Sequence, residues 1–259
     1  MIVRKSPDEI ATMARAGAVV ARAHEAVREA VRPGATTLDL DRIAEKVIIG
    51  EGATPSFKGY HGFPATLCTS VNDEVVHGIP SSDHVLEHGD VLSVDCGAIV
   101  DGFHGDAAVT WVVGGDDAVD PATRALIDET REAMWAGIRA CEVGNHLGDI
   151  GAAIEAVGNR AGRGVVTGYT GHGIGRALHE DPSVPNHGRA GRGMRLTAGL
   201  VLAIEPMFTV GRAETAVLED DWTVISVDGS LSAHWEHTVA LTPEGPWVLT
   251  ARSDEPDRL

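Results

Sequence analysis

Four acidic residues and one histidine occur in segments where a side chain of their type needs a partner. The acidic residues lie within or beside apolar, strand-like segments, and the histidine lies between two glycines. Burying an unpaired charge is prohibitive, so each carboxylate needs a cation or a proton. A salt-bridged structural role is the alternative for either glutamate alone, and a structural role is the alternative for the histidine; together the five residues favour a shared site. The five residues are Asp95, Asp106, His172, Glu205 and Glu236.

Asp95 and Asp106 lie on the two strands of a predicted β-hairpin, one on each side of its turn. Asp101-Gly102, between two strand-like runs, is a strong signal for a two-residue turn. With that turn, residues an odd number of positions apart face the same side of the sheet, which places both carboxylates on one face, diagonally opposed. Two carboxylates that close repel each other unless a cation lies between them or one is protonated. Two exposed strand aspartates are the alternative, although both strands are otherwise apolar.

Glu205 and Glu236 interrupt two further apolar segments. Glu205 lies in the apolar run 200–210, and Pro206 after it predicts that the strand ends or bulges at this point. Strand alternation places Glu236 opposite His237 and on the same face as His234. His172 belongs to a glycine-rich loop, where the backbone can approach a ligand closely.

A set of oxygen ligands with one nitrogen favours divalent manganese, iron or cobalt, and zinc less strongly. Four carboxylates match the charge of two divalent ions, and ions about 3.5–4 Å apart hold a bridging water that is nucleophilic near neutral pH. The three cysteines, Cys68, Cys96 and Cys141, form no close-spaced pair, so neither a disulfide framework nor a thiolate zinc site is expected.

Two pairs of helices are predicted to support these segments. Ser6, Pro7 and Glu9 form a helix start, and the first helix ends at Pro33-Gly34. Gly17 inside it is tolerable where another element packs close. Further helices are predicted over residues 38–49, 121–139 and 147–159, and strand-like segments follow each pair.

The order of elements repeats along the chain. A shift of 110 positions aligns Gly34 with Gly144 and Asp39 with Asp149. Residues 1–259 are therefore interpreted as one domain with an internal pseudo-repeat, about 6–115 and 120–250, and a cleft between such halves is a natural ligand site. A chance similarity of two helix–turn–helix segments is the alternative.

Composition restricts the partners. The 21 Lys+Arg and 38 Asp+Glu give a net charge of −17, which argues against nucleic acid and anionic membranes. The apolar fraction of 43% is enough for a sizeable core. The N-terminal residues lack the apolar stretch of a signal peptide, so a reduced, cytoplasmic setting is expected.

The ordered motifs of this sequence resemble those of the type I methionine aminopeptidases. The motifs are Asn72-Asp-Glu-Val-Val-His77-Gly-Ile-Pro, Asp95, Asp-Gly-Phe-His-Gly-Asp106, Gly-His172-Gly-Ile-Gly, His179-Glu, Ile-Glu205-Pro-Met and Glu236-His-Thr, and they extend from about residue 6 to residue 250. The resemblance implies an α/β (α+β) pita-bread fold, with two pseudo-symmetric halves of helices packed on antiparallel sheet. It also implies removal of the initiator methionine when the second residue is small and uncharged.

The resemblance implies individual roles. Asp95, Asp106 and Glu236 would hold one metal ion; Asp106, His172, Glu205 and Glu236 would hold the second. Glu205 would also accept a proton from the bridging water, and His77 and His179 would contact the scissile amide. The methionine pocket would be lined by Tyr60, Phe63, Cys68, Leu178 and Trp222. Phe63 and Leu178 depart from the tyrosine and the aromatic residue often found there, which affects the shape of the pocket but not its apolar character.

The expected partners are nascent polypeptide N-termini, with a transient ribosome contact and a monomeric enzyme. The sequence begins without the zinc-binding or Pro-rich extension of some family members, so docking modules of that kind are not expected. Two alternatives stay open. One is a proline-directed relative such as prolidase or aminopeptidase P; the other is a non-enzymatic homologue that binds protein partners. The second should have lost metal ligands, and none of the five is missing.

Overall fold

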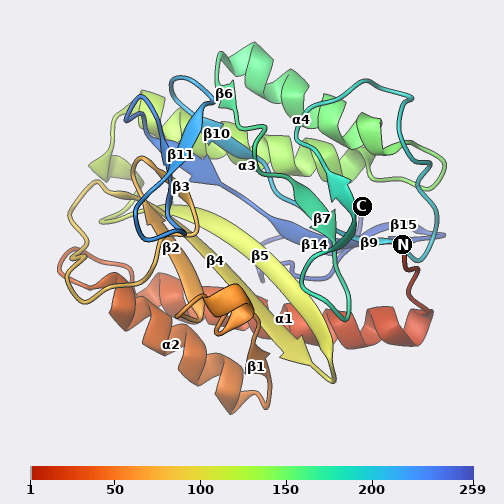
Figure 1. Ribbon diagram of the computed structural model, residues 1–259, viewed down its shortest axis with the longest axis horizontal. Coiled ribbons are helices and arrows are strands. Elements are labelled where there is room, and N and C mark those ends of the chain that lie inside the picture. The colour runs from red at the N-terminus through yellow and green to blue at the C-terminus, as the bar shows by residue number, and fades with distance from the viewer. Residues whose placement is uncertain (1) are drawn as a thin grey trace.

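The computed structural model describes residues 2–259 (Figure 1). Its α-helices are α1 (Pro7–Ala30), α2 (Thr37–Gly50), α3 (Pro121–Ala140) and α4 (Leu147–Ala161), and two short 3₁₀ turns are η1 (Tyr60–Gly62) and η2 (Asp116–Ala118). The predicted capping box is present, because the Ser6 side chain accepts from the Glu9 amide and the Glu9 carboxylate accepts from the Ser6 amide. Among the described residues, no helix combines the length and the apolar character needed to span a membrane.

Among residues 2–259 the strands form four antiparallel sheets. Their orders are β1-β4-β2 with β5 paired to β4, then β13-β10-β6, β11-β12-β3 and β15-β14-β9-β7-β8. The strands are β1 (Thr54–Pro55), β2 (Leu67–Val71), β3 (Glu74–Val76), β4 (Val91–Val100), β5 (Phe103–Val112), β6 (Gly164–Val165), β7 (Gly171–Gly173), β8 (Glu180–Val184), β9 (Val201–Ile204), β10 (Met207–Thr209), β11 (Thr215–Val217), β12 (Val224–Ser226), β13 (Ser232–His234), β14 (His237–Thr242) and β15 (Gly245–Val248).

Each pair of helices covers its own set of strands. In the view of Figure 1, α1 and α2 lie below the long β4–β5 hairpin, and α3 and α4 lie above the other strands. One buried core joins α1 and α2 to β4 through side chains such as Val20, Leu40 and Val94. Another joins α3 and α4 to the C-terminal strands through Met134, Ile154 and Leu202. The two helix layers therefore enclose the strands that carry the candidate residues.

Equivalent backbone contacts recur 110 positions apart. The amide of Gly34 donates to the Leu86 carbonyl at 2.8 Å, and that of Gly144 donates to the Leu196 carbonyl at 3.0 Å. Both glycines have positive φ, +87° and +101°, a conformation that glycine adopts without strain. The same geometry thus precedes α2 and α4.

Gly17 is a point of close backbone approach. A Cβ at this position would collide with the carbonyl oxygen of Leu249, which lies just after β15. The absent side chain therefore lets α1 contact the backbone of the C-terminal segment, as the sequence predicted for a glycine inside a helix.

The hairpin register is the predicted one. Asp95 pairs with Ala108 and Asp106 pairs with Gly97, so both carboxylates lie on one face, diagonally opposed. The predicted interruption at Pro206 is also present, because β9 ends at Ile204 and β10 begins at Met207.

The segment around His172 differs from the prediction. It forms strand β7 rather than a glycine-rich loop, pairing with β8 and β9. The reason is steric: a Cβ at Gly171 or Gly173 would collide with a backbone carbonyl oxygen of a neighbouring strand. The two glycines therefore serve close strand packing around the histidine.

Candidate metal centre

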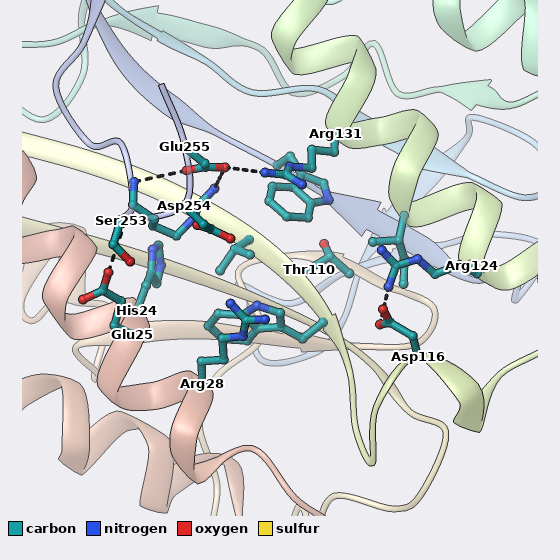
Figure 2. Close-up of a pocket in the computed structure, with 15 residues that line it drawn as sticks. His24, Glu25, Arg28, Thr110, Asp116, Arg124, Arg131, Ser253, Asp254 and Glu255 are labelled. Atoms are coloured by element: carbon teal, nitrogen blue, oxygen red, sulfur yellow. Dashed lines mark hydrogen bonds and ion pairs between the residues drawn. The ribbon is translucent and has the colours of Figure 1, made fainter. Parts of the chain in front are cut away.

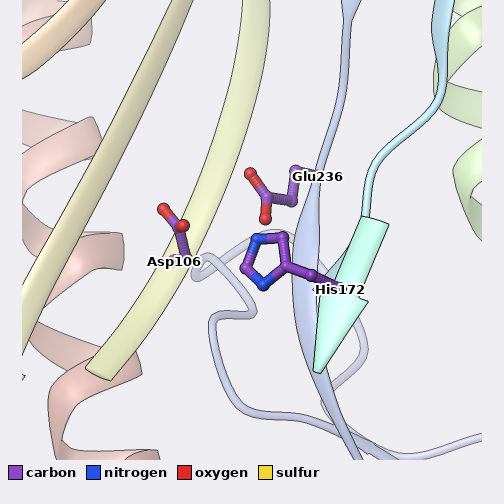
Figure 3. Close-up of side chains that lie close together, drawn as sticks. All are labelled: Asp106, His172 and Glu236. Atoms are coloured by element: carbon purple, nitrogen blue, oxygen red, sulfur yellow. The ribbon is translucent and has the colours of Figure 1, made fainter. Parts of the chain in front are cut away.

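The five residues predicted to share a site come from five different segments and meet in one place. Asp95 lies on β4, Asp106 on β5 and His172 on β7, while Glu205 follows β9 and Glu236 precedes β14. Ligand atoms of Asp106, His172 and Glu236 all lie within 4.8 Å of one another. Figure 3 shows these three side chains directed toward a common point from β5, β7 and the approach to β14.

Glu205 lies between two imidazoles. Its Oε1 is 3.5 Å from His172 Nε2, and its Oε2 is 3.6 Å from His234 Nε2. Glu205, His234 and Glu236 form a second group that could hold an ion. His234 is absent from the predicted ligands, although strand alternation had placed it on the face of Glu236.

The acidic residues lack the partners that buried carboxylates require. Asp95 Oδ1, Asp106 Oδ1 and Glu236 Oε1 are buried without a hydrogen bond among the described residues. Burial raises the pKa of Asp95 to about 7 and that of Glu205 to about 8, and it raises the pKa values of Asp106 and Glu236 well above their usual range. Neighbouring carboxylates add to this effect at Asp106 and Glu236. A cation would restore the charged forms, so these unpartnered oxygens fit divalent metal.

His172 presents one nitrogen toward the carboxylates. Its Nδ1 lies 2.9 Å from the Gly173 carbonyl oxygen, an arrangement that places a proton on Nδ1 and leaves Nε2 as an acceptor. Burial, followed by the nearby His179, lowers the pKa of His172 to about 3. A neutral imidazole is the form that binds metal.

Hydrogen bonds to the backbone fix two of the carboxylate-bearing segments. Thr238 Oγ1 accepts from the Asp106 amide at 3.0 Å and donates to the Asp106 carbonyl at 2.7 Å. The Asn186 side-chain amide donates to the Glu205 carbonyl at 3.0 Å. Neither residue was singled out from the sequence, because each acts on the main chain and carries no motif of its own.

An apolar recess adjoins the carboxylates within a single cavity of about 130 Å³. All twelve side chains singled out from the sequence line it, together with Phe57, which the sequence analysis missed. The lining residues are Phe57, Tyr60, Phe63, Cys68, His77, Asp95, Asp106, His172, Leu178, His179, Glu205, Trp222 and Glu236. Phe57 lies three positions before Tyr60, and no spacing rule distinguishes it from a core residue.

Two histidines border the recess. Tyr60 Oη lies 2.8 Å from His179 Nδ1, which orients that imidazole. The ring of His77 meets those of Tyr169 and Trp222 edge-on, at centroid separations of 5.7 and 6.4 Å. Burial lowers the pKa of His77 to about 4, so this side chain is neutral near pH 7. Both histidines can therefore act as neutral hydrogen-bond donors.

The family model of metallopeptidase family M24 matches residues 11–243. The chain therefore belongs to metallopeptidase family M24, a class of hydrolases that use divalent metal. It is 56% identical over 257 residues to methionine aminopeptidase 1 of Mycobacterium tuberculosis, covering 96% of this chain and 95% of that one. It is 49% identical to methionine aminopeptidase of Clostridium acetobutylicum, covering 96% and 99%.

Solved structures agree with this assignment. The crystal structure of methionine aminopeptidase from Thermotoga maritima superimposes with a TM-score of 0.94 at 42% identity, covering 97% of this chain and 100% of that one. The prolidase from Pyrococcus horikoshii has a TM-score of 0.79 at 22% identity, over 65% of its length, and shares the fold alone. The predicted pita-bread fold, with mixed helices and antiparallel sheets, is thus confirmed.

Proposed function

We propose that this enzyme removes the N-terminal methionine from nascent polypeptides whose second residue is small and uncharged. The observation that carries the proposal is the single cavity in which an apolar recess adjoins four carboxylates and a neutral histidine. The similarity to methionine aminopeptidases over nearly the whole chain supports it.

The proposed centre holds two divalent ions. Asp95, Asp106 and Glu236 would bind one ion; Asp106, His172, Glu205 and Glu236 would bind the other. The unpartnered oxygens of Asp95, Asp106 and Glu236 support this assignment, as does the mixed oxygen and nitrogen set. Cobalt, manganese or iron suits these ligands, and zinc suits them less well. Divalent ions held by these residues would supply an activated water molecule for attack on the peptide bond.

The remaining roles belong to side chains of the recess. Glu205 would accept the proton of the attacking water, and its position between His172 and His234 is consistent with that task. His77 and His179 would donate hydrogen bonds to the scissile amide, or to the oxyanion that develops from it. The methionine side chain would contact Tyr60, Phe63, Cys68, Leu178 and Trp222.

The edge-to-face packing of Phe63 and Trp222, with ring centroids 5.1 Å apart, supports an apolar wall for this pocket. An unbranched methionine side chain with a polarizable sulfur suits aromatic surroundings of this kind.

We also propose that residues 1–259 act as one monomeric domain, composed of the two similar halves 6–115 and 120–250. The recurrent backbone contacts before α2 and α4 support this division. The proposed setting is the cytoplasm, where the enzyme would meet new chains during a transient ribosome contact.

The two alternative functions differ from the proposed one in the peptides that the protein would cleave. A proline-directed enzyme would prefer Ala-Pro to Met-Ala peptides, and a non-enzymatic homologue would cleave neither. Hydrolysis of Met-Ala-Ser and Ala-Pro peptides, by chelated protein and by the same protein after metal is restored, tests the proposal. Metal-dependent cleavage of Met-Ala-Ser alone is expected, and a preference for Ala-Pro would overturn it.

A further inference from the structure

A second cavity, of about 150 Å³, lies apart from the metal centre (Figure 2). Residues of α1, β5 and α3 line it, together with Trp235 and the C-terminal segment 252–255. None of the residues that line the metal centre is shared with it. Four arginines contribute to its wall, and they come from three separate parts of the chain. The four are Arg28, Arg124, Arg131 and Arg252.

Several buried polar atoms of this wall have no hydrogen-bond partner among the described residues. They are Arg131 Nε, Arg252 Nη1, Trp235 Nε1 and both ring nitrogens of His24. Arg252 is only 8% exposed, Trp235 7% and His24 0%. Arginine and tryptophan nitrogens are donors only, and a neutral histidine has one donor and one acceptor. The unsatisfied atoms are therefore almost all donors, and a bound species must supply acceptors.

The carboxylates of the wall are mostly engaged already. Glu255 Oε1 accepts from Arg131 at 3.1 Å and from Arg252 at 2.8 Å, and its Oε2 lies 3.2 Å from His237 Nε2. Asp116 pairs with Arg124, and Glu25 accepts from the Ser253 amide. The exposed Asp254 is a weak partner for Arg252.

Arg28 is an exposed arginine at the rim of this cavity, whose wall also holds the carboxylates of Glu25 and Asp254. In Figure 2 its side chain extends from α1 toward the cavity. Among residues 2–259 its guanidinium has no ion-pair partner within 4.0 Å. A planar guanidinium of this kind matches phosphate geometry, since it can donate two parallel hydrogen bonds.

We infer that this cavity binds a small oxyanion of the phosphate type, held by Arg28 at its mouth and by the donors of Arg131, Arg252 and Trp235 in its wall. Inorganic phosphate and a phosphate monoester share this chemistry. Ordered water alone would satisfy some of the buried donors, but it would not balance the charges of Arg131 and Arg252, which share the single carboxylate of Glu255.

Location is tested first. Crystals of the metal-loaded protein are soaked in selenate, whose anomalous scattering marks its position. We expect a peak in the cavity within hydrogen-bond distance of Arg28. A peak confined to the metal centre, or no peak, would mean that the cavity holds water only and would overturn the inference.

Affinity is tested second, by calorimetric titration of the metal-loaded protein with inorganic phosphate. Arg28→Gln should weaken the binding about tenfold or more, because a hydrogen bond to a charged group is lost. Arg22→Gln is the matched control: it changes an exposed arginine on the same helix, which pairs with Glu51 outside the cavity. Equal affinities of the wild type and Arg28→Gln would contradict the proposal.

Two further measurements test the wall donors and the kind of anion. Trp235→Phe removes the Nε1 donor and keeps a ring, so it should weaken phosphate binding even where a substitution of buried Arg252 prevents folding. Glycerol 3-phosphate serves as the monoester: tighter binding than inorganic phosphate assigns the site to a phosphorylated metabolite, and equal binding assigns it to the free anion.

Discussion

Lys5 and Glu180 form a buried ion pair that joins the N-terminal segment to the start of β8. The Nζ–Oε2 distance is 2.6 Å, and the two side chains are only 3% and 13% exposed. Glu180 also accepts from the Ala177 amide at 3.2 Å, which closes the turn that contains Leu178 and His179. The pair therefore fixes a turn whose two central residues border the catalytic cavity.

Lys5→Met should lower both stability and turnover. The substitution leaves Glu180 buried without its partner, and breaking such a pair costs about 3 kcal/mol in the free energy of unfolding. Urea unfolding measures that loss, and kcat for a Met-Ala peptide measures the displacement of His179. Arg15→Met is the control, since it breaks an exposed pair with Asp101 and should cost less than about 1 kcal/mol. A stable variant with unaltered kcat would show that the ion pair does not position the turn.

Removal of metal should abolish hydrolysis. Exhaustive chelation is expected to leave a folded but inactive protein, and manganese, cobalt or iron should restore activity, because the attacking water is activated only beside the ions. Elemental analysis confirms that the chelated sample is free of metal. Full activity in that sample would refute a metal-dependent reaction.

The residue after methionine should control the rate. Met-Ala, Met-Gly and Met-Ser peptides are expected to be cleaved, whereas Met-Lys and Met-Phe peptides are not, because the similarity to methionine aminopeptidases implies a crowded position just past the metals. The measurement is kcat/KM for each peptide under the same metal load. Comparable values for Met-Ala and Met-Phe would count decisively against this rule.

His172→Ala and His179→Ala should fail in different ways. His172 faces the carboxylates through Nε2, so its loss should weaken binding of one ion. His179 is oriented by Tyr60, and its loss should keep the metal stoichiometry while lowering kcat about 10²–10³-fold, as for a donor used in the transition state. Calorimetric metal titration beside kcat and KM separates the two. If both variants lose metal equally, His179 is a ligand.

His24 should make the protein less stable as the pH falls. Burial, and then the charge of Arg252, lower its pKa well below the usual 6.5, so the folded protein keeps this imidazole neutral. The unfolded chain binds a proton below about pH 6.5, and this group's contribution then falls by up to about 1.4 kcal/mol per pH unit. Above that pH its contribution is constant.

The comparison is with His24→Gln, which cannot titrate. Urea unfolding from pH 7.5 to 5.5 in a phosphate-free buffer should show a shallower loss of stability for the variant. Parallel curves for the two proteins would mean that His24 is protonated in the folded state.

The elements that the sequence predicted are those whose geometry is decided by residues close together in the chain. The Ser6 cap and the Asp101-Gly102 turn act within a few residues, so the start of α1 and the register of the β4–β5 hairpin followed directly from sequence. The position of His234 beside Glu205 could not follow in this way. It depends on the pairing of Met207 with His234, which joins β10 to β13 across more than 20 residues. The arginine-lined cavity could not be predicted from short-range signals either, because α1, α3 and residues 252–255 meet only in the finished fold.

The contact at Gly17 bears on the order in which this chain can fold. The backbone of α1 at Gly17 lies against that of Leu249, more than 200 residues later in the sequence. Contacts of such long sequence separation slow folding, because the intervening loop must close before they stabilise anything. Until residue 249 has emerged, α1 lacks this neighbour and that part of its surface stays open to water. The surface around Gly17 is therefore covered only late in synthesis, whereas the face of α1 that packs on α2 and β4 finds its partners within the first half of the chain.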